Sequence, residues 1–117
     1  MPDAALIVLA GTDSPSDLGR VVNALQTARE FDEAGDDIAV VFDGAGTQWI
    51  PQLEDEDHDY HALYADVEAH VQACEYCADA YDVHSEVEAS DATLESAFDG
   101  HPSVRSFVDD GYEIITY

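Results

Sequence analysis

The chain has 117 residues, 46% of them hydrophobic, and a formal net charge of -24 at pH 7. This length suits a single domain, residues 1–117, that buries roughly two-thirds of the surface of its unfolded chain. The chain has 27 Asp and Glu residues but only three basic residues, Arg20, Arg29 and Arg105. This imbalance excludes nucleic-acid binding through a basic surface and disfavours binding to anionic membranes.

The first part of the chain predicts a strand, a helix and a second strand. Residues 5–10 are an apolar run closed by Gly11, which is typical of a parallel strand covered on both faces. Ser14 as N-cap and Pro15 begin a helix whose apolar residues repeat at helical spacing until Gly35. Residues 38–42 predict a buried strand, so this is a βαβ unit with parallel strands, and α/β is the expected fold class.

The remaining segments extend the α/β pattern. Residues 46–53 contain a short helix near Pro51, and residues 54–59 form an acidic loop that lacks the central Gly and terminal Glu of an EF-hand. Residues 60–68 predict a second crossover helix, which leads to a strand at residues 70–74. The last elements are a helix at 77–81, an ambiguous segment at 83–89 that favours extended backbone, a short helix at 91–98 capped by Ser90, a helix from Ser103 to Gly111 and a final strand at 112–117.

The two cysteines, Cys74 and Cys77, are spaced C-x-x-C where the third strand meets a helix. In a parallel sheet, reactive groups gather beyond the carboxyl ends of the strands, where the strand order reverses. We therefore expect the Cys74 sulfur to be exposed in that crevice, with the helix start lowering its pKa. Cys77 lies about one turn further on and can return toward Cys74. Thr12, Asp13 and Asp43, at the ends of the first two strands, are the expected substrate-binding residues of the crevice.

Other interpretations of these residues stay open. Both cysteines could be small buried hydrophobes or a thioredoxin-type dithiol, although Glu75 between them disfavours a thiolate. A zinc site would need the cysteines together with His70 and His84, but these histidines are isolated on either side, so no metal site is expected. The remaining histidines fall on expected loops or helix ends and should be solvated: His58, His61 and His101. Phosphate-binding loops and a nucleophile elbow are absent from the sequence, so no cofactor is expected.

Acidic residues occur in every segment, so the folded surface itself should be acidic. An acidic surface of this kind is better explained as adaptation to a salty cytoplasm, as in a salt-in halophile, than as a functional feature that binds cations. No segment has the length of a membrane span, and the N-terminus lacks the basic region and cleavage site of a signal peptide. We therefore expect a cytoplasmic protein whose cysteines are thiols.

The order of the elements and three segments resemble the DsrE/DsrF-like family of small sulfur-handling proteins. The segments are L-I-V-L at residues 6–9, V-Q-A-C-E-Y-C at 71–77 and G-Y-E-I-I-T-Y at 111–117, and the likeness is to an acidic, haloarchaeal-type member with a C-x-x-C. The resemblance implies a flavodoxin-like three-layer α/β/α sandwich with a mainly parallel sheet, assembled into homo-trimers or homo-hexamers. It also implies that a cysteine at a strand end, matched here by Cys74, carries sulfane sulfur as a persulfide.

The favoured hypothesis is a sulfur-relay or sulfurtransferase-like protein in which Cys74 bears the persulfide and Cys77 assists as a resolving thiol. Two other functions stay open. One is a non-catalytic oligomeric interaction protein on the same fold, and the other is a redox switch in which the two cysteines form a disulfide. The expected partners are further copies of the chain and proteins that donate and accept sulfur.

Overall fold

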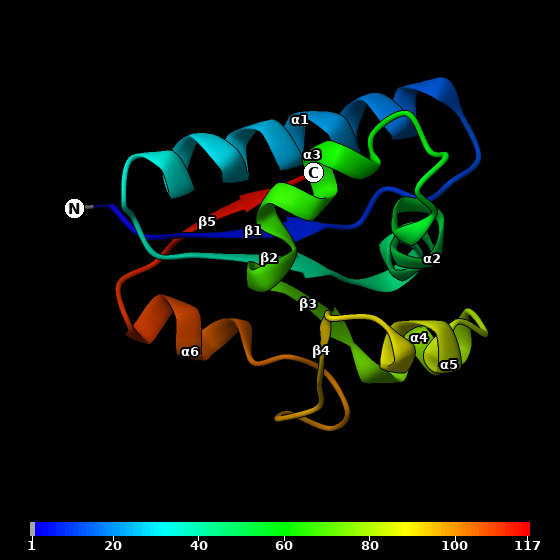
Figure 1. The fold of residues 1–117 in the computed structure, drawn as a ribbon. Helices are drawn as coiled ribbons and strands as arrows, with labels where there is room; N and C mark the ends of the chain where they lie inside the picture. The colour runs from blue at the N-terminus through cyan, green and yellow to red at the C-terminus, as the bar shows by residue number, and fades with distance from the viewer. Residues whose placement is uncertain (1) are drawn as a thin grey trace.

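The fold is built on a parallel β-sheet (Figure 1). The computed structural model describes residues 2–117, and within them five strands pair in the order β4-β3-β2-β1-β5, each parallel to its neighbours. The strands are β1 (Ala4–Val8), β2 (Ile38–Phe42), β3 (Val71–Cys74), β4 (Thr93–Glu95) and β5 (Glu113–Thr116). The chain passes from the edge strand β4 to the far side of β1, so the strand order reverses between β1 and β5.

Helices connect successive strands. The α-helices are α1 (Pro15–Glu33), α2 (Trp49–Glu54), α3 (His61–Val67), α4 (Glu75–Ala80), α5 (His84–Ala89) and α6 (Val104–Asp109). Two short 3-10 helices precede α2 and β3, namely η1 (Gly44–Gln48) and η2 (Glu68–His70).

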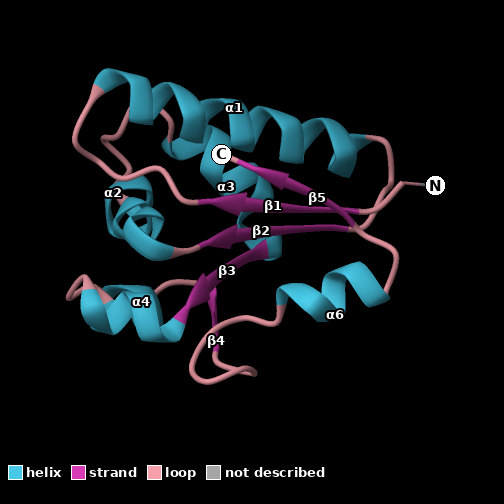
Figure 2. Cartoon of the chain, turned by 180° about the vertical axis from the view of Figure 1, so that it is seen from behind, coloured by secondary structure: helices cyan, strands magenta, loops and turns pink. Residues whose placement is uncertain are grey.

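The helices cover the sheet unevenly, with α1 and α3 on one face and α6 on the other (Figures 1 and 2). The larger core lies beneath α1, where Leu25 is buried together with Leu6 and Phe42 of the sheet. On the second face, Phe107 of α6 packs against a smaller cluster that includes Val41. The helices α2, α4 and α5 gather at the carboxyl ends of the strands. This is the predicted flavodoxin-like α/β/α sandwich, with a fully parallel sheet in the described residues.

Elements with strong local signals lie where the sequence places them. The Ser14 hydroxyl accepts the Asp17 N–H at 3.2 Å, so α1 begins at Pro15 as predicted. The buried strand β2 has the predicted bounds. Before α6, the Ser103 hydroxyl accepts the Ser106 N–H at 3.2 Å and caps the predicted last helix.

Two segments after Cys77 differ from the prediction. The segment at 83–89, where the sequence favours extended backbone, is mostly the helix α5. The predicted helix at 91–98 is wrong, because residues 93–95 form the edge strand β4, in which Leu94 lies opposite Ala73 of β3. Ser90 accordingly caps no following helix, and its hydroxyl donates to a carbonyl at the end of α5. Long-range pairing with β3 overrides the local helical spacing.

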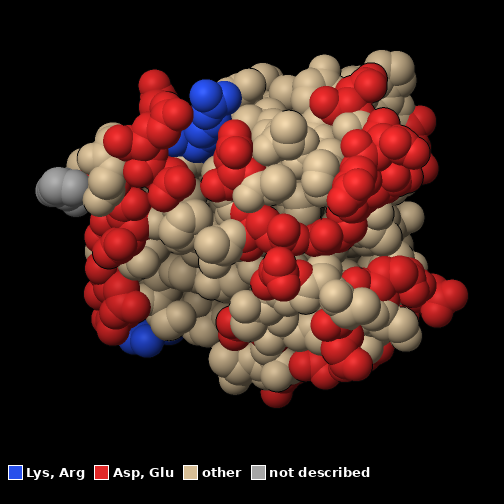
Figure 3. Space-filling model, viewed as in Figure 1, with Lys and Arg blue, Asp and Glu red and all other residues tan. Residues whose placement is uncertain are grey.

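The surface carries acidic groups throughout the visible face, and basic groups appear at two separate places on it (Figure 3). Arg29 is paired with Glu33 one turn further along α1, at 3.2 Å. Within residues 2–117, no helix combines the length and the apolar character needed to cross a membrane.

Candidate functional site

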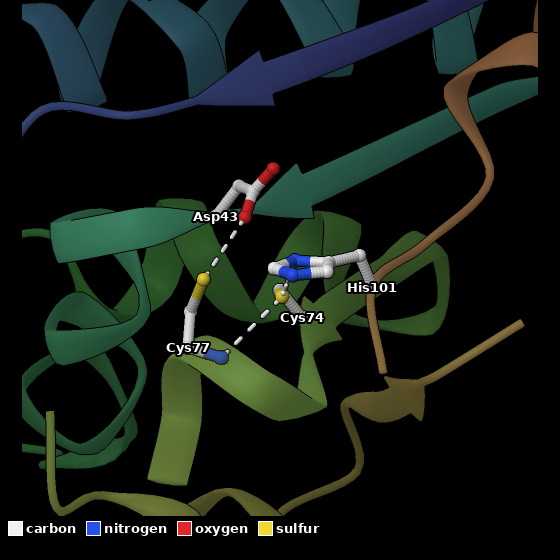
Figure 4. A group of neighbouring side chains, drawn as sticks. All are labelled: Asp43, Cys74, Cys77 and His101. Atoms are coloured by element: carbon white, nitrogen blue, oxygen red, sulfur yellow. Dashed lines mark hydrogen bonds between the residues drawn. The ribbon is translucent and has the colours of Figure 1, made fainter. Parts of the chain in front are cut away.

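Four side chains meet at the carboxyl ends of β2 and β3 (Figure 4). Asp43 follows β2, Cys74 ends β3, Cys77 lies in α4, and His101 lies in the connection between β4 and α6. One oxygen, sulfur or nitrogen atom of each lies within 4.8 Å of those of the others. The fold thus brings together the two thiols of the C-x-x-C with a carboxylate and an imidazole that are distant from them in the sequence.

Cys74 reaches the site because side chains alternate along β3. Val71 and Ala73 pack into the larger core, so Cys74 points toward the opposite face of the sheet. There its Sγ accepts the Cys77 N–H at 3.4 Å, which makes Cys74 the N-cap of α4. Cys74 is fully buried, and its Sγ contacts His101 in the connection to α6. The predicted exposure of its sulfur is therefore wrong.

His101 is placed by a tight turn at residues 98–101. Phe98 and His101 exchange backbone hydrogen bonds of 2.9 and 2.8 Å, and the two residues between them have positive φ, +51° at Asp99 and +88° at Gly100. These values fit a two-residue type I′ turn, for which Asp-Gly is a preferred sequence. His101 Nδ1 lies 3.2 Å from Cys74 Sγ.

The expectation that His101 is solvated is wrong, since it is half-buried and contacts a cysteine. Its ring also packs against the Tyr76 ring, with 4.8 Å between the centroids. The Asp99-Gly100 pair is the sequence signal that bears on the position of His101. It predicts the turn, but it does not indicate which strand the turn lies against.

Cys77 and Asp43 form the other half of the site. Cys77 Sγ donates to Asp43 Oδ1 at 3.3 Å, and Cys77 is half-buried whereas Cys74 is fully buried. The same Asp43 oxygen accepts the Gly44 N–H at 2.9 Å and caps η1. Gly46, further along η1, has to be glycine, because a Cβ there would lie 2.2 Å from the Val8 carbonyl oxygen. The turn after β2 thus packs directly on the end of β1, which fixes the position of Asp43.

Burial raises the pKa of the Cys74 thiol to about 12. The Cys77 N–H opposes this rise, while the Cys77 thiol and the Asp43 carboxylate add to it. The prediction of a lowered Cys74 pKa is therefore wrong, because burial outweighs the helix start. Cys74 is a thiol at neutral pH unless a neighbouring base takes its proton, and His101 Nδ1 is in contact with its sulfur.

The structure brings together some of the predicted site residues and leaves others apart. Asp43 joins the two cysteines, but Thr12 and Asp13 line a different cavity of about 340 Å³ beside Trp49. The Cys74 site is at β3, whereas the strand order reverses between β1 and β5, so its predicted place at the reversal is wrong.

The zinc site considered in the sequence analysis, in which His70 and His84 would join the two cysteines, does not form. His70 Nε2 contacts Asp32 at 3.1 Å, and His84 Nε2 lies 3.8 Å from Glu75. Both histidines are paired with carboxylates, and the imidazole beside the cysteines is that of His101 instead.

Comparisons with known proteins agree with this architecture. A model of the DsrE/DsrF-like family matches residues 5–117. The uncharacterized protein MJ0733 of Methanocaldococcus jannaschii is 30% identical over 95 residues, which are 81% of this chain and 78% of that protein. A conserved protein of unknown function from Bacteroides thetaiotaomicron, BT1422, has a solved structure with a TM-score of 0.65 at 15% identity, covering 97% of this chain and 94% of that one. This last likeness concerns the fold alone.

Proposed function

Because the chain belongs to the DsrE/DsrF-like family, we propose that it acts in a sulfur relay and carries sulfane sulfur as a persulfide on the Cys74 and Cys77 pair. Sulfur relay is the activity that the family suggests, and the two thiols are the groups of this chain suited to it. The cytoplasm is the proposed compartment, since reducing conditions there keep both thiols available.

The observation that carries the proposal is the polar environment of the Cys74 sulfur. A buried thiol with only apolar neighbours would be an inert part of the core. Cys74 Sγ instead contacts His101 Nδ1 at 3.2 Å and the Cys77 N–H at 3.4 Å. The imidazole can take the thiol proton, and the N–H group stabilises negative charge on the sulfur.

The different burial of the two thiols suggests an order of transfer. Cys77 is the more exposed thiol, so it meets the persulfide of a donor, R–S–SH, first. Its sulfur attacks the outer sulfur of the donor, the donor S–S bond breaks, and the donor leaves as the thiol R–SH. Cys74, after giving its proton to His101, then attacks the outer sulfur on Cys77, which regenerates the Cys77 thiol. Each step exchanges one S–S bond for another, so no oxidant or reductant is needed.

Intact mass spectrometry with peptide mapping tests this function. The reduced protein is exposed to polysulfide in high salt, and we expect one reducible sulfur added to the Cys74 peptide. In Cys74→Ser the added sulfur should stay on Cys77, and Cys77→Ser should load Cys74 more slowly. An unmodified wild-type protein would contradict the proposal and favour an interaction module.

A redox switch is the second candidate, because the two Sγ atoms lie within 4.8 Å of each other. In the same experiment it would appear as the loss of two hydrogens and a Cys74 to Cys77 link, with no added sulfur.

We also propose that the chain forms a homo-oligomer, a trimer or a hexamer. Phe98 and Val108 are 67% and 58% exposed, and Val104, one turn before Val108 on α6, is 39% exposed. Phe98 also lines an apolar cavity of about 380 Å³ together with Pro102 and Val104. An apolar surface of this kind favours contact with further copies of the chain or with sulfur donor and acceptor proteins.

A further inference from the structure

We propose that Asp43, Cys74, Cys77 and His101 together bind one Zn²⁺ ion. This goes beyond the proposed sulfur relay, because metal binding needs no sulfur donor and uses Asp43, which the transfer steps do not. The site would have one oxygen, two sulfur and one nitrogen ligand, all provided by this chain.

The donor atoms are of the types that zinc prefers. Cysteine sulfur, histidine nitrogen and aspartate oxygen are its usual protein ligands, and four of them complete a tetrahedral site. The thiolates select zinc over Mg²⁺ or Ca²⁺, which prefer sites made of oxygen atoms alone. This distinction matters here, because the acidic surface of a chain with 27 Asp and Glu residues also attracts hard cations without specificity.

The spacing of the donor atoms is close to that of a tetrahedral zinc site. With bonds of about 2.3 Å to sulfur and about 2.0 Å to nitrogen or oxygen, the ligand atoms of such a site lie about 3.3–3.8 Å apart. Here His101 Nδ1 and Cys74 Sγ are 3.2 Å apart, and Cys77 Sγ and Asp43 Oδ1 are 3.3 Å apart. All four atoms lie within 4.8 Å of one another, so small side-chain rotations bring them around one ion.

The backbone holds these side chains in place before an ion binds. The Cys77 N–H already donates to Cys74 Sγ, so the C-x-x-C segment is folded with both sulfurs on one side. Asp43 is fixed by the hydrogen bond that its carboxylate accepts from the Gly44 N–H, and His101 by its turn and by the Tyr76 ring. Zn²⁺ would displace the thiol protons, and its positive charge would balance the negative charges of the two thiolates and the carboxylate.

Zinc and persulfide would compete for the site. Both sulfurs are ligands in the metal-bound state, so neither could attack a donor persulfide. Zinc binding would therefore keep the thiols unreactive until a chelator or a sulfur donor displaces the ion.

The test is a titration of the reduced full-length chain with Zn²⁺ in high salt, against a chromophoric chelator, followed by a titration with Co²⁺. We expect one ion per chain, and Co²⁺ should give thiolate-to-metal charge transfer and the strong visible bands of a tetrahedral site. His101→Ala and Asp43→Asn should each weaken Zn²⁺ binding by at least about tenfold. His84→Ala is the matched control, since His84 pairs with Glu75 and should leave the affinity unchanged.

The readouts separate this inference from the proposed function. Circular dichroism establishes which variants are folded, and Asp43→Asn keeps the side-chain shape if His101→Ala does not fold. Absence of thiolate-to-Co²⁺ charge transfer, or unchanged affinity in both variants, would overturn the zinc site even if polysulfide still loads Cys74. Tight Zn²⁺ binding without any sulfur loading would retain the zinc site and reject the sulfur relay.

Discussion

At the scale of single residues, we expect the contact between Cys74 and His101 to decide how fast Cys74 reacts. Burial raises the pKa of Cys74 to about 12, so the reactive thiolate forms only when a base accepts the proton. His101 Nδ1, at 3.2 Å, is placed to do this. We expect His101→Ala to slow the appearance of the Cys74 persulfide by about 100-fold, the lower end for loss of a general base.

The measurement is the rate at which sulfur appears on Cys74, by quenched mass spectrometry with fragmentation of the peptide that carries both cysteines, on metal-free protein. His84→Ala, which removes an imidazole paired with Glu75, should load at the wild-type rate. Equal rates for wild-type and His101→Ala would show that Cys74 does not need this base.

A second residue-scale prediction concerns Glu68 of η2, whose charged neighbours are Glu54 and Asp91. Its Oε2 is buried without a hydrogen-bond partner among residues 2–117. Burial raises the pKa of Glu68 from 4.5 to about 7, and the Glu54 and Asp91 carboxylates add to the rise. The folded state therefore holds this proton at a pH where the unfolded chain has lost it. The free energy of unfolding should fall as the pH rises from 4.5 to about 7 and then level off.

Glu68→Gln removes this titration. We expect it to raise the free energy of unfolding by roughly 1 kcal/mol at about pH 8, allowing for solvent screening, and to flatten the decline at lower pH. Urea unfolding at constant high salt measures both effects. Glu88→Gln removes one exposed charge, so an equal gain in that variant would attribute the effect to net charge alone.

At the scale of elements, the sequence predicts those whose signals are local. The Ser14 cap and the apolar spacing define α1, and Ser103 defines α6, because each signal lies within the helix or next to it. The strand β4 was missed because three residues carry little local signal, and its partner β3 is distant in the sequence. This error also hid His101, since only the position of β4 brings the turn after it to Cys74. The sequence places the C-x-x-C and Asp43 at the carboxyl ends of neighbouring strands, because Cys74 ends β3 and Asp43 directly follows β2.

The turn that carries His101 depends on Gly100. Its φ is +88°, and a Cβ there would lie 3.3 Å from Tyr76 Cβ. We expect Gly100→Ala to lower the free energy of unfolding by about 1–2 kcal/mol, the cost of a left-handed conformation for a residue with a Cβ. It should also weaken Zn²⁺ binding, because it displaces the imidazole.

Gly19→Ala is the matched control for this change. Gly19 lies inside α1, and a Cβ there would meet nothing within 4 Å. We expect that variant to gain about 0.5–1 kcal/mol, because Ala favours a helix over Gly. Thermal unfolding and the zinc titration are measured on both variants. An undiminished stability of Gly100→Ala would show that the turn relaxes without strain.

At the scale of the whole molecule, charge and apolar surface act in opposite directions. A net charge of -24 makes copies of the chain repel one another, and three arginines give little compensation. Molar salt shortens the screening length to about 3 Å, so the repulsion between copies then acts only at contact. We therefore expect the apolar surface to bring copies together only when salt screens this repulsion.

That apolar surface gives a prediction about assembly. Val104 and Val108 lie one turn apart on α6, and both are exposed, although α6 already packs on the sheet through Phe107. We expect the wild-type chain to form a trimer or hexamer in molar salt, and Val108→Glu to shift it to a smaller species, because a carboxylate would then be buried in the contact.

Size-exclusion chromatography with light scattering measures the mass of both variants. Tyr81→Glu adds the same charge at an exposed aromatic outside this surface and should leave the mass unchanged. A monomeric wild-type chain, or equal masses for wild-type and Val108→Glu, would mean that α6 does not form the contact between copies.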